Sequence, residues 1–332
     1  MSRFTTLRPG AHTAGAALLA ALAALDLVWI VRDFSKAADV TDAWWMWSGL
    51  LFRAQDGIWT SSFVEPTLLV LYTVCAVTAL LSSATAGILL STGALTILLR
   101  VPTLWNLNAS WVQGGVSDGL RTKVLISDIA MLVLAVALIV TAVAGRGPAG
   151  GARTGADAAA SPGSRHDVPA RPTPAGGLAA SVLLAAVAVV LISWEVRSWA
   201  EQGWDTYSDH FTGDRTLVTL LAVPESWYGW SLALLAAGGS VAAFRRSHLA
   251  RPLGMTVCAP LLGLGLFRLS FAAKAGLLES IGTLGLRDRL SMATSLFEVL
   301  VSLAVLLALA GRGGQASGAA PHSGTIRSFS SA

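Results

Sequence analysis

Eight apolar segments dominate this sequence, and each approaches the roughly 20 residues that a helix needs to cross a bilayer. They lie at Ala14–Val31, Thr67–Ser83, Gly87–Leu104, Val124–Ala144, Leu178–Val196, Trp227–Phe244, Leu253–Ala273 and Leu290–Ala310. Inside lipid a segment must satisfy its own backbone hydrogen bonds, as a helix does. Hydrophobic residues make up 54% of the chain and charged residues only 13%, against roughly 25% charged in soluble domains. We therefore predict an all-α integral membrane protein with eight transmembrane helices.

Three short motifs recur in register at a spacing of 165 or 166 residues. They are Trp29-Ile-Val-Arg32 with Trp194-Glu-Val-Arg197, Gly119-Leu-Arg121 with Gly285-Leu-Arg287, and Ala144-Gly-Arg-Gly147 with Ala310-Gly-Arg-Gly313. Trp and Arg are common at the ends of membrane helices, which is the alternative explanation. We interpret the matches as two tandem four-helix repeats. An even number of helices per repeat places both copies in parallel orientation.

The repeats define four parts of the chain. We expect a first transmembrane repeat at 1–146, a flexible cytoplasmic linker at 147–176, a second repeat at 177–312 and a disordered cytoplasmic tail at 313–332. Arg3 and Arg8 before an Ala/Leu run would also suit a signal peptide. We interpret the first segment as a span, because the fifth segment repeats it in mid-chain.

Basic and acidic residues together suggest an orientation. Arg245, Arg246 and Arg251 form the densest basic cluster in a short loop, and such loops face the cytoplasm. Only two acidic residues, Asp157 and Asp167, fall in the segments on that side. Arg outnumbers Lys, which with the heavy use of Ala and Gly is typical of a GC-rich, bacterial genome. We expect a multi-pass plasma-membrane protein with both termini in the cytoplasm.

Few charges fall within the apolar segments, and such charges normally face the bundle interior with a partner. Each repeat has an Arg in its third helix and an acid in its fourth, which predicts the pairs Arg100–Asp128 and Arg268–Glu298. Asp26 lies in the first segment. A structural pair or an Arg that extends to the interface explains this pattern. The alternative is a binding site for an anionic group or a proton-linked step.

Tryptophans gather in the loops of the proposed outer face. Trp44, Trp45 and Trp47 lie in the loop Arg32–Pro66, and Trp204 lies in the loop Arg197–Ser226. An aromatic belt at the headgroups explains them, although the other face has none. The alternative is an aromatic platform that folds over the helices as short helices or turns and binds a ligand. The stretch Asp205–Asp214 matches no calcium loop, and we expect a solvated acidic loop there.

Cofactors and nucleic acid are not expected. Cys75 and Cys258 are isolated in apolar segments, no histidine falls in a predicted span, and no basic patch or catalytic motif is present. The leading hypothesis is a non-enzymatic protein in the lipid bilayer that binds a lipid, small molecule or exported peptide at its outer face. One alternative is a transporter or channel with its site between the repeats. The other is a membrane enzyme that uses Asp26, Asp128 or Glu298.

Overall fold

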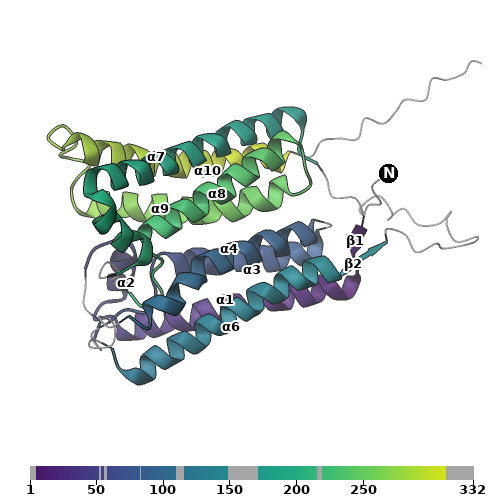
Figure 1. Cartoon of the computed structure of the whole chain (residues 1–332), viewed down its shortest axis with the longest axis horizontal. Coiled ribbons are helices and arrows are strands. Elements are labelled where there is room, and N and C mark those ends of the chain that lie inside the picture. The colour runs from purple at the N-terminus through teal and green to yellow at the C-terminus, as the bar shows by residue number, and fades with distance from the viewer. Residues whose placement is uncertain are drawn as a thin grey trace, which may run out of the picture.

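The computed structural model describes residues 5–51, 54–55, 58–82, 84–109, 116–148, 171–214 and 219–311. Two bundles of four long helices lie side by side (Figure 1). The first bundle consists of α1 (Pro9–Lys36), α3 (Val64–Leu81), α4 (Thr85–Asn106) and α6 (Asp118–Ala144). The second consists of α7 (Pro174–Thr212), α8 (Glu225–Phe244), α9 (Ala250–Lys274) and α10 (Leu286–Ala310).

Packing follows the same order in both bundles. The first helix contacts the second and the fourth, and the third packs along the fourth. The described remainder includes one short helix, α2 (Val40–Trp47), and the antiparallel strands β1 (Thr5–Leu7) and β2 (Arg146–Pro148). The short helix and the strands lie at opposite ends of the molecule (Figure 1). We call these the α2 end and the strand end.

Seven of the described helices are long and apolar enough to cross a membrane. Their outward faces carry large apolar side chains such as Val74, Val133 and Leu307, as a helix surface in lipid requires. The chain is thus an all-α, multi-pass membrane protein. α8 is not among the seven, because its first turns hold Trp, Tyr, Ser and Gly in place of aliphatic residues.

The two bundles meet closely through α3, α4, α8 and α9. Gly263 of α9 approaches α3 so tightly that a methyl group there would overlap Thr67. Small residues let membrane helices approach in this way. The Thr256 and Ser91 hydroxyls hydrogen bond across the interface at 2.9 Å, both buried. Side chains therefore fill the contact between the bundles at these positions.

Helix α7 is much longer than the predicted span and corrects the expectation of a loop from Arg197 onward. It has 39 residues and runs through the acidic stretch to Thr212, with one break at Gly203, whose φ is 77°. Glycine populates positive φ without steric cost, so it ends one helical stretch and starts the next. Arg197 pairs with Glu201 one turn later at 2.7 Å, which supports the extra turns.

One histidine also departs from expectation. His12 lies inside α1, which begins at Pro9, five residues before the predicted start. Its Nδ1 hydrogen bonds to the Ala79 carbonyl at 2.9 Å and lies 3.0 Å from the Thr85 hydroxyl. The contact ties α1 to the turn between α3 and α4. Residues 149–170 of the proposed linker 147–176 and the whole proposed tail 313–332 lie outside the described residues, while α7 already begins at Pro174.

Candidate functional site

Tryptophan gathers at the α2 end in the described residues. Short helix α2 carries Trp44, Trp45 and Trp47 and folds onto the bundles, which confirms the expected short helix in this loop. Trp44 and Trp47 both stack against Phe267 of α9, with ring centroids 4.8 and 6.2 Å apart. The Lys274 ammonium lies 4.9 Å from the centre of the Trp45 ring. All three indoles thus have packing partners in the fold.

The start of α2 is fixed by Asp39. Its carboxylate accepts hydrogen bonds from the Thr41 amide and hydroxyl, while Asp42 accepts one from the Asp39 amide. This reciprocal cap satisfies amides that a helix start leaves open. The Thr41 hydrogen bonds lower the pKa of the Asp39 carboxyl from its ordinary value of 3.8.

Asp33 anchors the segment that follows α2. Its buried carboxylate accepts hydrogen bonds from the Thr60 amide, the Ser61 amide and the Ser61 hydroxyl. The Arg32 guanidinium contacts the same carboxylate at 2.6 Å. Trp47 donates its indole N–H to the Ser61 hydroxyl at 3.0 Å, so α2 is held by the same segment. Asp33 therefore fixes the segment at Thr60 and Ser61, and through Ser61 it helps to position Trp47 of α2.

Arg100 lies at the centre of the first bundle with its side chain fully buried. Its Nη2 donates to Asp26 Oδ1 of α1 at 2.9 Å, and its Nη1 donates to Glu65 Oε1 of α3 at 2.6 Å. Both carboxylates are fully buried as well. The Glu65 Oε2 also accepts from the Ser62 amide and hydroxyl at the start of α3. One guanidinium thus joins three helices.

The predicted Arg100–Asp128 pair is wrong, because Arg100 pairs with Asp26 and Glu65 instead. Asp128 is buried on α6, has Arg100 and the Thr103 hydroxyl among its polar neighbours, and forms no ion pair in the described part of the chain. Neither of its carboxylate oxygens is in hydrogen-bond geometry. The guanidinium therefore reaches the acids on α1 and α3, and not the acid on α6, the next long helix after α4.

The second bundle has a comparable set of charges. Arg268 of α9 lies 3.7 Å from Glu298 of α10, which confirms the predicted ion pair, and 3.3 Å from Glu225 of α8. Glu298 is almost fully buried, whereas the Arg268 and Glu225 side chains are 38% and 70% exposed. Glu195 of α7 belongs to the same region of the bundle, but it forms no ion pair with Arg268 within 4.0 Å.

Each bundle therefore contributes one charged residue from every long helix, in the same order. The first helix gives an acid, the second gives a glutamate in its first turn, the third gives an arginine and the fourth gives an acid. The members are Asp26, Glu65, Arg100 and Asp128 in the first bundle, and Glu195, Glu225, Arg268 and Glu298 in the second. We call these the first and second charge layers. The first is sealed, and the second reaches the surface.

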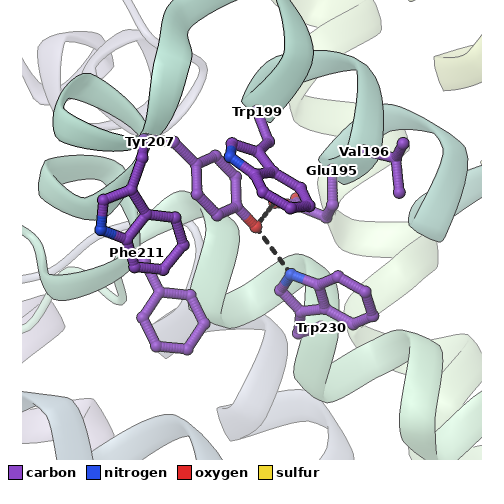
Figure 2. Close-up of a pocket in the computed structure, with 7 residues that line it drawn as sticks. Glu195, Val196, Trp199, Tyr207, Phe211 and Trp230 are labelled. Atoms are coloured by element: carbon purple, nitrogen blue, oxygen red, sulfur yellow. Dashed lines mark hydrogen bonds between the residues drawn. The ribbon is translucent and has the colours of Figure 1, made fainter.

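A pocket opens beside the second charge layer. It has a volume of about 310 Å³ and is formed by α7 on both sides of its break, together with α8. Figure 2 shows aromatic rings around it, with the Glu195 carboxylate next to the Tyr207 hydroxyl. Besides Val196, its lining side chains are Glu195, Trp199, Trp204, Tyr207, Phe211 and Trp230.

Hydrogen bonds orient the polar groups of the pocket. The Trp230 indole N–H donates to the Tyr207 hydroxyl at 2.7 Å, and that hydroxyl donates to Glu195 Oε2 at 3.1 Å (Figure 2). Gly229 lies on α8 beside the carboxylate, and a methyl group there would overlap Glu195 Oε1. A glycine at this position lets the carboxylate rest against the helix.

The residues that the sequence proposed for ligand binding do not form one site in the structure. Trp44, Trp45 and Trp47 pack around α9 at the α2 end, whereas Trp204 lines the pocket. The charged residues proposed with them occupy the two charge layers. In the described residues, no group of three or more His, Cys, Asp or Glu side chains is arranged to hold a metal ion.

Three acids in these layers were not proposed as site residues from the sequence. Glu65 and Glu225 precede apolar runs and resemble ordinary first-turn helix acids. Glu195 follows Trp194 at a predicted helix end, where an exposed charge is usual. Glu65 and Glu225 each lie in the first turn of the second helix of a repeat, and Glu195 lies on a first helix, as Asp26 does. This correspondence between the repeats is the signal that could have found them. Comparison with known proteins gives no match to any family model, curated protein or solved structure.

Proposed function

We propose that the protein binds a small molecule at the outer face of the plasma membrane, in the aromatic pocket of the second bundle. The observation that carries this proposal is the contrast between the charge layers. Every member of the first layer is buried, and Arg100 pairs with both Asp26 and Glu65, as a structural element requires. The second is partly exposed and adjoins a concave, mostly aromatic cavity, which is the usual form of a ligand site.

The proposal includes a tandem duplication. The shared order of acid, glutamate, arginine and acid adds a third kind of support to the sequence matches and the equivalent helix packing. We propose that α8 is the eighth span, because it has 20 residues and packs along α7 and α9. In this view one copy kept a sealed charge layer, and the other opened its layer to a pocket.

The proposed orientation places the α2 end outside and both termini in the cytoplasm. Trp rings at the α2 end support it as an interfacial surface, and the basic turn between α8 and α9 lies at the strand end (Figure 1). Reporter fusions within 147–176 test the orientation. They should report the cytoplasm, and a signal from the opposite side would overturn it.

The alternatives receive less support. A transporter site between the bundles would need space where Gly263 and Thr67 instead lie in close contact. An enzyme that uses Asp26, Asp128 or Glu298 would need a cavity that reaches them, whereas the pocket reaches Glu195.

Mass spectrometry of the purified full chain tests ligand binding. A small molecule should copurify with the wild-type protein and be lost from Trp204→Leu, because Trp204 is 64% exposed and lines the pocket. Trp44→Leu is the matched control, since Trp44 is 43% exposed at the same end but lies on α2. Equal retention by both variants would place the ligand elsewhere and contradict the proposal.

A further inference from the structure

The pocket combines many aromatic faces with one carboxyl group. Five of its seven lining side chains are aromatic, one is aliphatic, and Glu195 is the one carboxylic acid among them, with no lysine, arginine or histidine in the lining. Glu195 forms no ion pair within 4.0 Å in the described residues. We infer that the ligand carries a methylated ammonium group, which the aromatic rings and the Glu195 carboxylate bind together; this inference rests on the proposed function.

Ring geometry supports a cation rather than a flat stacked ligand. The Trp199 and Trp204 rings lie 6.2 Å apart at 74°, and Trp204 and Tyr207 lie 6.2 Å apart at 42°. All three side chains line the pocket, and their ring planes are inclined to one another, so they bound it from different directions. Each ring has a negative face that attracts a cation within roughly 6 Å of its centre, and aromatic cages of this kind recognise quaternary ammonium groups.

The carboxylate supplies charge complementarity at a fixed position. Glu195 is 92% buried, held by Tyr207 on one side and placed against Gly229 on the other. Its hydrogen-bond donor is itself fixed by Trp230. A cation in the pocket would lie beside this charge in a region of low dielectric, where Coulomb attraction is stronger than in water.

Other ligand classes fit the lining less well. A hard metal ion needs six or more oxygen ligands for calcium, or a nearly octahedral set for magnesium, and the lining offers one carboxylate and one phenol. An anion would meet the carboxylate and the negative ring faces. A methylated ammonium spreads its charge over an apolar surface, so it loses little hydration when rings surround it.

Size and position limit the source of this group. A volume of about 310 Å³ lies at the lower end of the roughly 300–1,000 Å³ typical of small-molecule pockets. The pocket is lined by the C-terminal part of α7 and the first turns of α8. These segments lie at the α2 end (Figure 1), where we place the headgroup level. A free methylated amine and the choline headgroup of a lipid share the chemistry that this pocket recognises.

The test compares choline with its neutral carbon isostere, 3,3-dimethylbutan-1-ol, on the full chain in a maltoside detergent. Ligand-observed NMR titration measures both affinities. Choline should bind at least 10-fold more tightly than the isostere. Glu195→Gln keeps the hydrogen-bond acceptor and removes the charge, so it should remove this 10-fold preference while binding of the isostere stays the same. Trp204→Leu should weaken both probes, and Trp44→Leu should weaken neither.

The outcomes separate this inference from the proposed function. Equal binding of both probes that Trp204→Leu weakens would overturn the ammonium group but retain the pocket as a ligand site. Absence of binding by either probe, with copurified ligand unaffected by Trp204→Leu, would overturn both. Short-chain phosphatidylcholine then distinguishes the source: displacement of choline by this lipid supports a headgroup, and displacement by free methylated amines alone supports a soluble cation.

Discussion

Arg100 is the residue whose removal should most damage the fold. Its side chain is fully buried, and it forms ion pairs of 2.9 and 2.6 Å with two fully buried carboxylates. Arg100→Met leaves Asp26 and Glu65 without their cation in the bundle interior. Removing one partner of a buried pair costs roughly 3–5 kcal/mol. We expect a loss of unfolding free energy in that range.

Neutralising the carboxylates as well should restore most of the stability. The triple variant with Arg100→Met, Asp26→Asn and Glu65→Gln removes the guanidinium and both carboxylates that pair with it, and it keeps similar side-chain volumes. Uncharged replacements of a buried ion pair are often neutral or stabilising. We therefore expect the triple variant to lie within about 2 kcal/mol of the wild-type protein, well above Arg100→Met alone.

Arg268 provides the matched comparison in the second bundle. Its side chain is 38% exposed, and its contacts to Glu225 and Glu298 are longer, at 3.3 and 3.7 Å. Exposed ion pairs contribute roughly 0–1 kcal/mol, and the buried Glu298 adds to this. Arg268→Met should therefore cost no more than about 2 kcal/mol.

Unfolding by sodium dodecyl sulfate in mixed micelles, followed by circular dichroism, measures these differences. Equal losses for Arg100→Met and Arg268→Met would refute the distinction between a sealed and an open charge layer. A triple variant as unstable as Arg100→Met would show that the loss comes from packing rather than from uncompensated charge.

Three further predictions use the contacts at the α2 end. Gly229→Ala should cost roughly 1–3 kcal/mol by overpacking against Glu195, measured by the same unfolding assay, and much less in a Glu195→Ala background; an equal cost in both would exclude this clash. Since the folded-state pKa of Asp39 is lowered, the cap of α2 contributes fully above the unfolded value near 3.8 and is lost as the pH falls through the lower folded-state pKa. Tryptophan fluorescence should therefore change in acid, and Asp39→Asn should remove that change. Soluble iodide should quench only part of the fluorescence, and quenching of most indoles would contradict the folded aromatic surface. Among the described residues, the indoles expected to respond are the exposed Trp44, Trp105, Trp199 and Trp204.

The apolar pattern alone determined the class of this protein. Segments of about 20 apolar residues have one stable conformation in lipid, so helices such as α3, α4 and α6 could be placed from their sequence. The pattern was weakest where polar residues continued a helix. The sequence predicted a loop at Trp199 and Trp204, yet α7 runs through both, because helical hydrogen bonding does not depend on an apolar side chain.

Charge pairing was decided by the tertiary structure. Arg268 and Glu298 lie on consecutive antiparallel helices at matching depth, so their contact followed from sequence distance and helix rise. The same argument gave Asp128 as the partner of Arg100, but depth along a helix does not fix which face points inward. The rotation of each helix about its axis directs Asp26 and Glu65 at Arg100, and that rotation comes from packing among all four helices.

The pocket also depends on the tertiary structure and could not be predicted from the sequence. Its walls come from both sides of the break in α7 and from α8, and its carboxylate fits because Gly229 has no side chain. The sequence shows the aromatic residues and the glycine, which are common in any membrane protein. The break at Gly203 changes the direction of α7, and this change brings Trp204 and Tyr207 to the same cavity as Trp230 of α8.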